Sequence, residues 1–173
     1  MRDLLEQIDK ALEANLYYVA LFVSLAIPDI CGAIGSPDGK ATKPKYVNWF
    51  DKYVGPRYSS TIIGRPISFL TGEDCYYFRC SLLHQGSSQH TKSSYSRILF
   101  VEPSATTNVF HCNILNDALN IDVRVFCRDI ISGALIWLKD CEGTELYQKN
   151  YDMFMRRYPK GLSPYMVGVP VIS

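Results

Sequence analysis

The apolar run LYYVALFVSLAIPDICGAI, residues 16–34, constrains the fold more than any other feature of this sequence. Before it, apolar residues recur at three- and four-residue steps from Leu4, with charged residues between them, which is typical of an amphipathic helix. Beyond Leu16 the pattern is apolar on every side, which predicts burial inside a helical bundle. The run contains Pro28 and Asp29, and its uncharged part is short for a membrane span. We therefore expect a core helix, kinked or restarted at Pro28, and no membrane partner.

Four further segments have a helical pattern: residues 45–54, 71–86, 121–138 and 144–158. Thr71 is a suitable N-cap for the second of them, and Gly86 is a suitable left-handed residue to end it. Asn120 or Asp122 is expected to cap the third. The segment 35–44 is rich in turn residues and ends the first helical unit. The segment 55–69 contains two glycines and two prolines, so we expect it to be an irregular connector.

Two short segments rich in β-branched and aromatic residues, 97–103 and 108–115, predict a small β-hairpin. The tail 163–173 is too short for a separate domain, and we expect it to pack on the body. The predicted fold class is therefore mainly α: a bundle of about five helices with a small inserted β-hairpin, in one domain spanning residues 1–173.

Composition excludes several broad classes of protein. With 47% hydrophobic and 13% aromatic residues, a chain of 173 residues can bury a sizeable core and is not disordered throughout. A net charge of +1 argues against a strongly basic nucleic-acid binder, although a local patch or a dimer cleft can still attract RNA. No secretory signal and no CxxC accompany the six cysteines, so we expect reduced thiols and a cytoplasmic protein.

The segment RCSLLH places Arg79 and His84 five residues apart, near the predicted end of the helix 71–86. A polar segment, QGSSQHTKSSYS, follows directly. Five steps of about 100° separate the two residues by about 140° around an ideal helix. With this separation, one exposed helix face does not easily present both side chains. A cleft between two helix ends, one from each subunit of a dimer, can bring the Arg79–His84 pairs of both subunits together.

This R-x4-H arrangement, at the end of a helix within a predicted bundle, resembles that of the HEPN superfamily of all-α ribonucleases. The resemblance implies a metal-independent endoribonuclease that acts as a homodimer with a composite cleft. Carried onto this chain, it implies that Arg79 binds the scissile phosphate and that His84 is the general acid or base at the ribose 2′-hydroxyl. Arginine suits phosphate because its planar fork stays charged, and histidine ordinarily titrates near neutral pH. We assign Ser81 and Gln85 as accompanying binding residues, and no cofactor or metal.

One position departs from the family. Active members commonly carry Asn, Asp or His directly after the arginine, whereas this chain has Cys80. Some members bind without cutting, so a non-catalytic dimer that binds a nucleotide, RNA or a partner protein is the alternative. A purely structural reading also exists, in which Arg79 pairs with a carboxylate and His84 bonds the last carbonyls of its helix.

Other chemistry has less support in the sequence. Cys80 and His84 have a spacing that can chelate zinc, with His111 and Cys112 as further ligands, but neighbouring residues on a strand point to opposite faces. No sequence context singles out a cysteine nucleophile, and there is no phosphate-binding glycine motif. We expect the aromatic residues near Tyr77 to pack in the core and the lysines near Lys43 to be solvated. The leading hypothesis is therefore a ribonuclease of a toxin or defence system, with RNA as substrate and an antitoxin or regulatory protein as a further partner.

Overall fold

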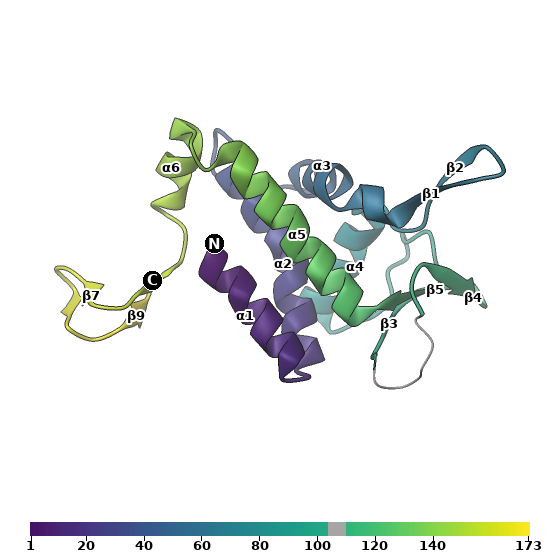
Figure 1. Cartoon of the computed structure of the whole chain (residues 1–173), viewed down its shortest axis with the longest axis horizontal. Coiled ribbons are helices and arrows are strands. Elements are labelled where there is room, and N and C mark those ends of the chain that lie inside the picture. The colour runs from purple at the N-terminus through teal and green to yellow at the C-terminus, as the bar shows by residue number, and fades with distance from the viewer. Residues whose placement is uncertain (104–109) are drawn as a thin grey trace.

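The computed structural model describes residues 1–103 and 110–173. The mainly α class is confirmed in this part of the chain, where six α-helices form most of the body (Figure 1). They are α1 (Arg2–Glu13), α2 (Tyr17–Ile34), α3 (Lys43–Tyr53), α4 (Gly72–Gln85), α5 (Val123–Cys141) and α6 (Glu145–Tyr151).

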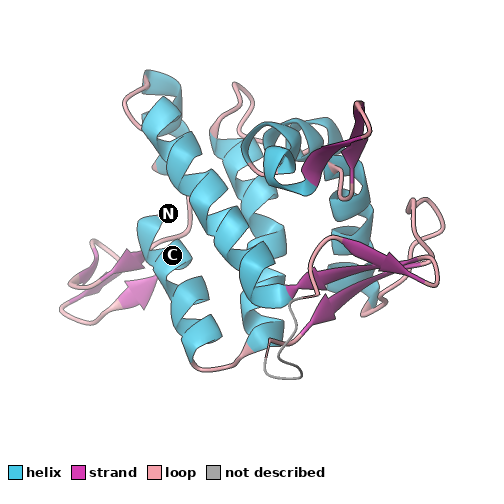
Figure 2. Ribbon diagram, turned by 45° about the vertical axis from the view of Figure 1, so that its right-hand side comes forward, coloured by secondary structure: helices cyan, strands magenta, loops and turns pink. Residues whose placement is uncertain are grey.

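Short strands lie at the two ends of this helical body (Figure 2). A 3-10 turn, Gly55–Tyr58, leads into the antiparallel pair β1 (Ser59–Ile62) and β2 (Arg65–Ser68). A three-stranded sheet has the order β3-β5-β4, formed by β3 (Arg97–Val101), β4 (Asn113–Leu115) and β5 (Ala118–Asp122). The C-terminal region pairs β6 (Arg157–Tyr158) with β9 (Val171–Ile172) and β7 (Gly161–Leu162) with β8 (Met166–Val167).

α2 is the central helix, in contact with α1, α3, α4, α5 and α6. Its mean hydropathy of 1.7 over 18 residues is high enough for a membrane span by length and composition. Half of that window is buried inside the body, as in a core helix. Pro28 lies within α2, which continues to Ile34, so no new helix begins there. The helical pattern of the sequence runs through Leu16 without a break, but Asn15 takes a left-handed backbone (φ 57°) that separates α1 from α2.

The expected hairpin between residues 97–103 and 108–115 is not the observed pairing, and residues 104–109 lie outside the described part of the chain. Within the described residues, β3 pairs in parallel with β5, and β5 pairs with β4 in an antiparallel hairpin. Asn116 and Asp117 form the turn of that hairpin with φ of 49° and 60°, the backbone of a tight two-residue β-turn. Residues 121 and 122, which the sequence pattern assigned to the start of a helix, therefore belong to the strand β5.

Two further expectations are corrected. The connector 55–69 contains the β1–β2 hairpin, whose turn residues Ile63 and Gly64 both have positive φ. The last helix ends at Tyr151, not before Pro159, and the chain then forms a ribbon that extends away from the body at the end opposite the sheet (Figure 1). Residues 163–170 of that ribbon are exposed, so this part of the tail does not pack on the body.

Candidate active site

Both ends of α4 are fixed by local signals that the sequence carries. Thr71 Oγ1 accepts a hydrogen bond from the Asp74 N–H (3.1 Å) and donates one to the Asp74 carboxylate (2.6 Å). The same carboxylate accepts from the Ser94 N–H at 2.9 Å, which ties the loop after α4 back to the start of the helix. At the other end Gly86 is left-handed (φ 63°), and its N–H donates to the Leu82 carbonyl. Both predicted caps are confirmed, and they set where the last turn of α4 presents its side chains.

Arg79 and His84 meet at that end. Arg79 Nη1 lies 3.1 Å from His84 Nε2. A guanidinium has no lone pair to offer and therefore donates, so Nε2 is the accepting nitrogen in this contact. Arg79 Nη1 also lies 3.7 Å from Cys80 Sγ. The angular argument for needing two subunits is therefore wrong, because the long arginine side chain spans the separation and one protomer brings the pair together.

Asp29 of α2 forms an ion pair with Arg79 Nη2. The two side chains are mostly removed from solvent, with 12% of Asp29 and 19% of Arg79 exposed. The Tyr76 ring lies beside the guanidinium, 5.9 Å from its centre to Cζ. Arg79 thus has a carboxylate on one side and the exposed His84 on the other, and its Nε has no hydrogen-bond partner among the described residues.

Burial decides the electrostatics of this ion pair. It raises the pKa of the Asp29 carboxyl above its ordinary value, and the nearby Arg79 guanidinium reverses only part of that effect. The carboxylate therefore gives up more hydration than the guanidinium replaces. Such a pair does little for the stability of the fold, but it fixes the direction of the arginine side chain.

The two accompanying residues are placed differently. Gln85 is exposed in the last turn of α4, beside His84. Ser81 lies in the interior with 1% of its surface exposed, and its hydroxyl has no hydrogen-bond partner among the described residues. This placement counts against a ligand-binding role for Ser81, because a ligand arriving from solvent does not reach its hydroxyl in this conformation.

The structure does not assemble the zinc ligands that the sequence suggested as an alternative. The His111 ring packs against Tyr58 with ring centres 5.4 Å apart and planes inclined by 58°, and burial lowers the pKa of its imidazole. Cys112 follows with a positive φ of 55°. Across residues 1–103 and 110–173, no three His, Cys, Asp or Glu side chains come together as a metal site.

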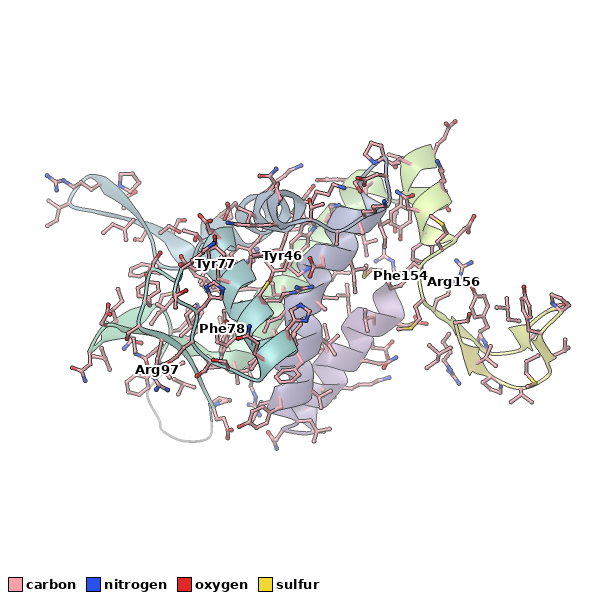
Figure 3. The ribbon with its side chains drawn as sticks, turned by 180° about the vertical axis from the view of Figure 1, so that it is seen from behind. Tyr46, Tyr77, Phe78, Arg97, Phe154 and Arg156 are labelled. Carbon is pink, nitrogen blue, oxygen red and sulfur yellow. The ribbon has the colours of Figure 1, made fainter. Side chains whose placement is uncertain are left out.

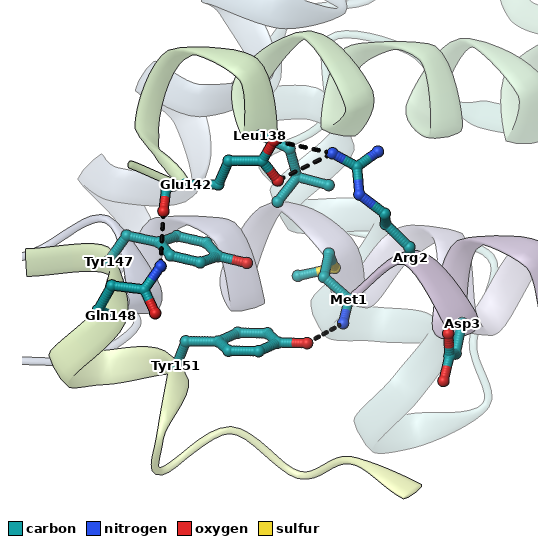
Figure 4. Close-up of a pocket in the computed structure, with 8 residues that line it drawn as sticks. All are labelled: Met1, Arg2, Asp3, Leu138, Glu142, Tyr147, Gln148 and Tyr151. Carbon is teal, nitrogen blue, oxygen red and sulfur yellow. Dashed lines mark hydrogen bonds and ion pairs between the residues drawn. The ribbon is translucent and has the colours of Figure 1, made fainter. Parts of the chain in front are cut away.

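A cavity lies away from this pair. It has a volume of about 420 Å³ and is bounded by the start of α1, the end of α5 and α6 (Figure 4). The Met1 amino group donates to the Tyr151 hydroxyl (2.9 Å) across it, and Arg2 makes a two-bond contact with Glu142 at its edge. It is lined by no residue of α4, so it is not a binding cleft for the Arg79–His84 pair.

Comparisons of this chain with models of protein families, with curated proteins and with solved structures find no match. Functional inference therefore depends on the geometry of the site and on the R-x4-H arrangement.

Sequence reasoning missed Asp29 as part of this site. The signal was present, since a carboxylate within an apolar buried helix needs a partner. In the sequence, Asp29 served only as evidence against a membrane span. The identity of its partner required the packing of α2 against α4.

Proposed function

We propose that this protein is a metal-independent endoribonuclease of HEPN type that acts in the cytoplasm in a toxin or defence system. The observation that carries the proposal is the direct contact between Arg79 and the exposed His84 at the end of α4. A fixed positive charge beside a basic nitrogen is the minimum that phosphodiester cleavage by a neighbouring hydroxyl requires.

In this mechanism Arg79 binds the non-bridging oxygens of the scissile phosphate and stabilises the charge that develops on them. When the phosphate draws Arg79 away from His84, Nε2 is free to take the proton of the ribose 2′-hydroxyl. The 2′-oxygen forms a bond to phosphorus while the bond from phosphorus to the 5′-oxygen breaks, and the leaving 5′-oxygen takes a proton from water. The products are a 2′,3′-cyclic phosphate and a 5′-hydroxyl.

The surface of α2 supports a homodimer. Tyr18, Val19 and Phe22 are exposed there, with 76%, 53% and 37% of their surfaces accessible. Seven residues separate Phe22 from Asp29, so the two lie within about 20° of each other on an ideal helix. An apolar face of this kind is typical of a protein contact. A second copy docked on it would bring its own Arg79–His84 pair close to the first.

The second candidate is a non-catalytic dimer that binds a nucleotide, RNA or a regulatory protein such as an antitoxin. Asp29 favours it, because the carboxylate neutralises Arg79 and must yield part of that contact before a phosphate binds. Cys80 favours it too, since its thiol next to Arg79 is a weak hydrogen-bonding group.

The test is cleavage of mixed RNA in EDTA by the wild type, Arg79→Ala and His84→Ala. Arg2→Ala is the matched control, because Arg2 also pairs with a carboxylate but lies at the other cavity. We expect each site variant to lose activity by about 100-fold or more and the control to keep it. The products should carry 2′,3′-cyclic phosphates, and a 2′-deoxy substitution at the cleaved position should block the reaction. Cleavage of the deoxy substrate, or equal activity of all variants, contradicts the proposal.

The dimer is tested with Tyr18→Lys and the control Tyr165→Lys, an exposed tyrosine on the C-terminal ribbon. Sedimentation should give a monomer for the first variant and a dimer for the second. A wild type that sediments as a monomer at micromolar concentration, or a Tyr18→Lys variant that remains dimeric, excludes this interface.

A further inference from the structure

A second group of side chains gathers around Tyr77, which lies on α4 about two turns before His84. The Tyr77 ring is stacked on the His90 imidazole, with ring centres 4.6 Å apart and planes inclined by 14°. Lys43 Nζ lies 4.3 Å from the centre of the Tyr77 ring, and Lys92 Nζ lies 5.8 Å from it. We call these four residues the Tyr77 cluster; Figure 3 shows Tyr77 on α4 near Tyr46 of α3.

The structure corrects the expectation that Tyr77 packs in the core. Tyr77 is half-buried, and its hydroxyl accepts from Lys43 (2.6 Å) and donates to Glu73 (3.1 Å). These two hydrogen bonds to the hydroxyl fix the orientation of the Tyr77 ring and leave its face free of them. Its stacking partner, His90, belongs to the loop 86–96, which has no helix or strand. The ring is therefore a fixed flat surface covered by a small flat group.

The charges of the cluster favour an anion. Lys43 is paired with Glu73, and that contact together with the Tyr77 hydroxyl raises the pKa of Lys43 to about 12. Lys92 has no carboxylate or other acceptor within hydrogen-bond distance of its ammonium among the described residues. Two ammonium groups and one carboxylate leave one positive charge, carried by Lys92 beside the aromatic surface.

The cluster is aligned with the proposed catalytic pair. Seven residues separate Tyr77 from His84, which places them within about 20° on an ideal helix and about 10 Å apart along its axis. A chain of nucleotides that passes His84 can therefore reach Tyr77 without crossing to another face of α4.

We propose that the Tyr77 cluster binds a nucleotide of single-stranded RNA next to the scissile phosphate: a base stacks on Tyr77 in place of His90, and Lys92 contacts the backbone phosphate. Unpaired bases stack on aromatic side chains in this way whatever their identity, and basic side chains follow the backbone. A base is larger than an imidazole and covers more of the phenol ring. The inference rests on the proposed function and adds a binding subsite to it, in which Tyr77 and Lys92 hold a nucleotide with an unpaired base.

The experiment measures binding of a short fluorescent single-stranded RNA by anisotropy, in a His84→Ala background that keeps the RNA intact. Tyr77→Leu removes the flat surface, while Tyr77→Phe keeps it. The matched controls are Tyr53→Leu and Lys52→Ala, because Tyr53 on α3 also has a lysine beside its ring, with Lys52 Nζ 4.6 Å from the ring centre. Circular dichroism of each variant checks that the fold is retained.

We expect Tyr77→Leu to weaken binding about tenfold and Tyr77→Phe to leave it nearly unchanged. Lys92→Ala, a change on the loop that spares the helix, should weaken binding and reduce the slope of log affinity against log salt by about one. His90→Ala should bind as well as its parent or better, because it vacates the ring. A duplex of the same sequence should compete poorly, since its bases are already stacked.

The proposal is overturned when Tyr77→Leu binds like the Tyr53→Leu control, when the duplex competes equally, or when His90→Ala binds as weakly as Tyr77→Leu. Failure of the two proposals is distinguishable. Binding that depends on Tyr77 without any cleavage by the wild type rejects only the nuclease. Cleavage that does not depend on Tyr77 rejects only this subsite.

Discussion

Removing Arg79 and removing Asp29 should have very different effects on stability, although the two side chains form one ion pair. Arg79→Met leaves the Asp29 carboxylate, 12% exposed, without its cation. Loss of one partner from a fully buried pair costs about 3–5 kcal/mol. Some solvent reaches this carboxylate, so we expect about 2–3 kcal/mol. For a chain of this length that corresponds to a fall in Tm of about 4–12 °C.

The converse change should cost less. Burial already raises the pKa of Asp29 despite the presence of Arg79, so the ionised carboxylate is less favourable in the folded protein than in the unfolded chain. Asp29→Asn removes that cost, but it also removes the attraction that raises the pKa of Arg79 against the effect of burial, so we expect a loss of about 1 kcal/mol. The double variant Asp29→Asn/Arg79→Met should recover most of the stability that Arg79→Met loses.

The pH dependence has a definite sign. The folded protein binds the Asp29 proton more tightly than the unfolded chain, whose carboxyl has the ordinary pKa of 3.8. Stability from this group therefore falls as pH rises from 3.8 through the raised pKa, and it is regained on acidification. In Arg79→Met that pKa rises further, so the deficit relative to the double variant should shrink as pH is lowered.

The assay is urea unfolding followed by circular dichroism at several pH values, for the wild type, both single variants and the double variant. Arg2 and Glu142 provide a control cycle, because their side chains are 58% and 45% exposed and their coupling should be below about 1 kcal/mol. A large destabilisation by Asp29→Asn, or a deficit of Arg79→Met that does not change with pH, refutes the view that burial outweighs attraction in this pair.

Two other predictions concern the fold. A Cβ at Gly72 would lie 2.7 Å from the Val47 carbonyl oxygen, so Gly72→Ala should push α3 away from α4. We expect it to lower the free energy of unfolding in urea by about 1–3 kcal/mol. Gly143→Ala is the control, because its Cβ would have no atom within 4 Å, and it should cost less than about 1 kcal/mol. Burial lowers the pKa of His111 from its ordinary 6.5, so stability should fall as pH drops below 6.5, and His111→Phe should flatten that dependence in thermal melts; an unchanged slope contradicts it.

The helices that local signals specify were predictable. Thr71, Gly86 and Asp122 act as caps because short side chains or a missing Cβ satisfy backbone groups a few residues away. The sheet was not predictable in the same way. β3 and β5 pair in parallel although about twenty residues separate them, and no local pattern records such a partner. Asn116 and Asp117 did carry a turn signal, but one that is equally compatible with the start of a helix.

The candidate site shows the same division. Arg79 and His84 were found from their spacing, but ideal helix angles placed them apart because those angles describe Cα positions and not the reach of a guanidinium. Asp29 could not be assigned to Arg79, since their contact depends on how α2 crosses α4. The stacking of Tyr77 on His90 likewise depends on a loop whose path the sequence does not fix.

Helix α2 carries both the apolar face proposed for the dimer and the carboxylate that pairs with Arg79. Asp29, which neutralises Arg79, lies on α2 in line with the exposed Tyr18 and Phe22. Because a single protomer already holds Arg79 against His84, a dimer is not needed to bring these two groups together. In the proposed dimer, a second copy docked on the apolar face would remove water from this part of α2 and so change the environment of Asp29. Less water around the carboxylate would make its ionised form less favourable, and a phosphate would displace it from Arg79 more readily. Assembly and phosphate binding are thus expected to favour each other through α2.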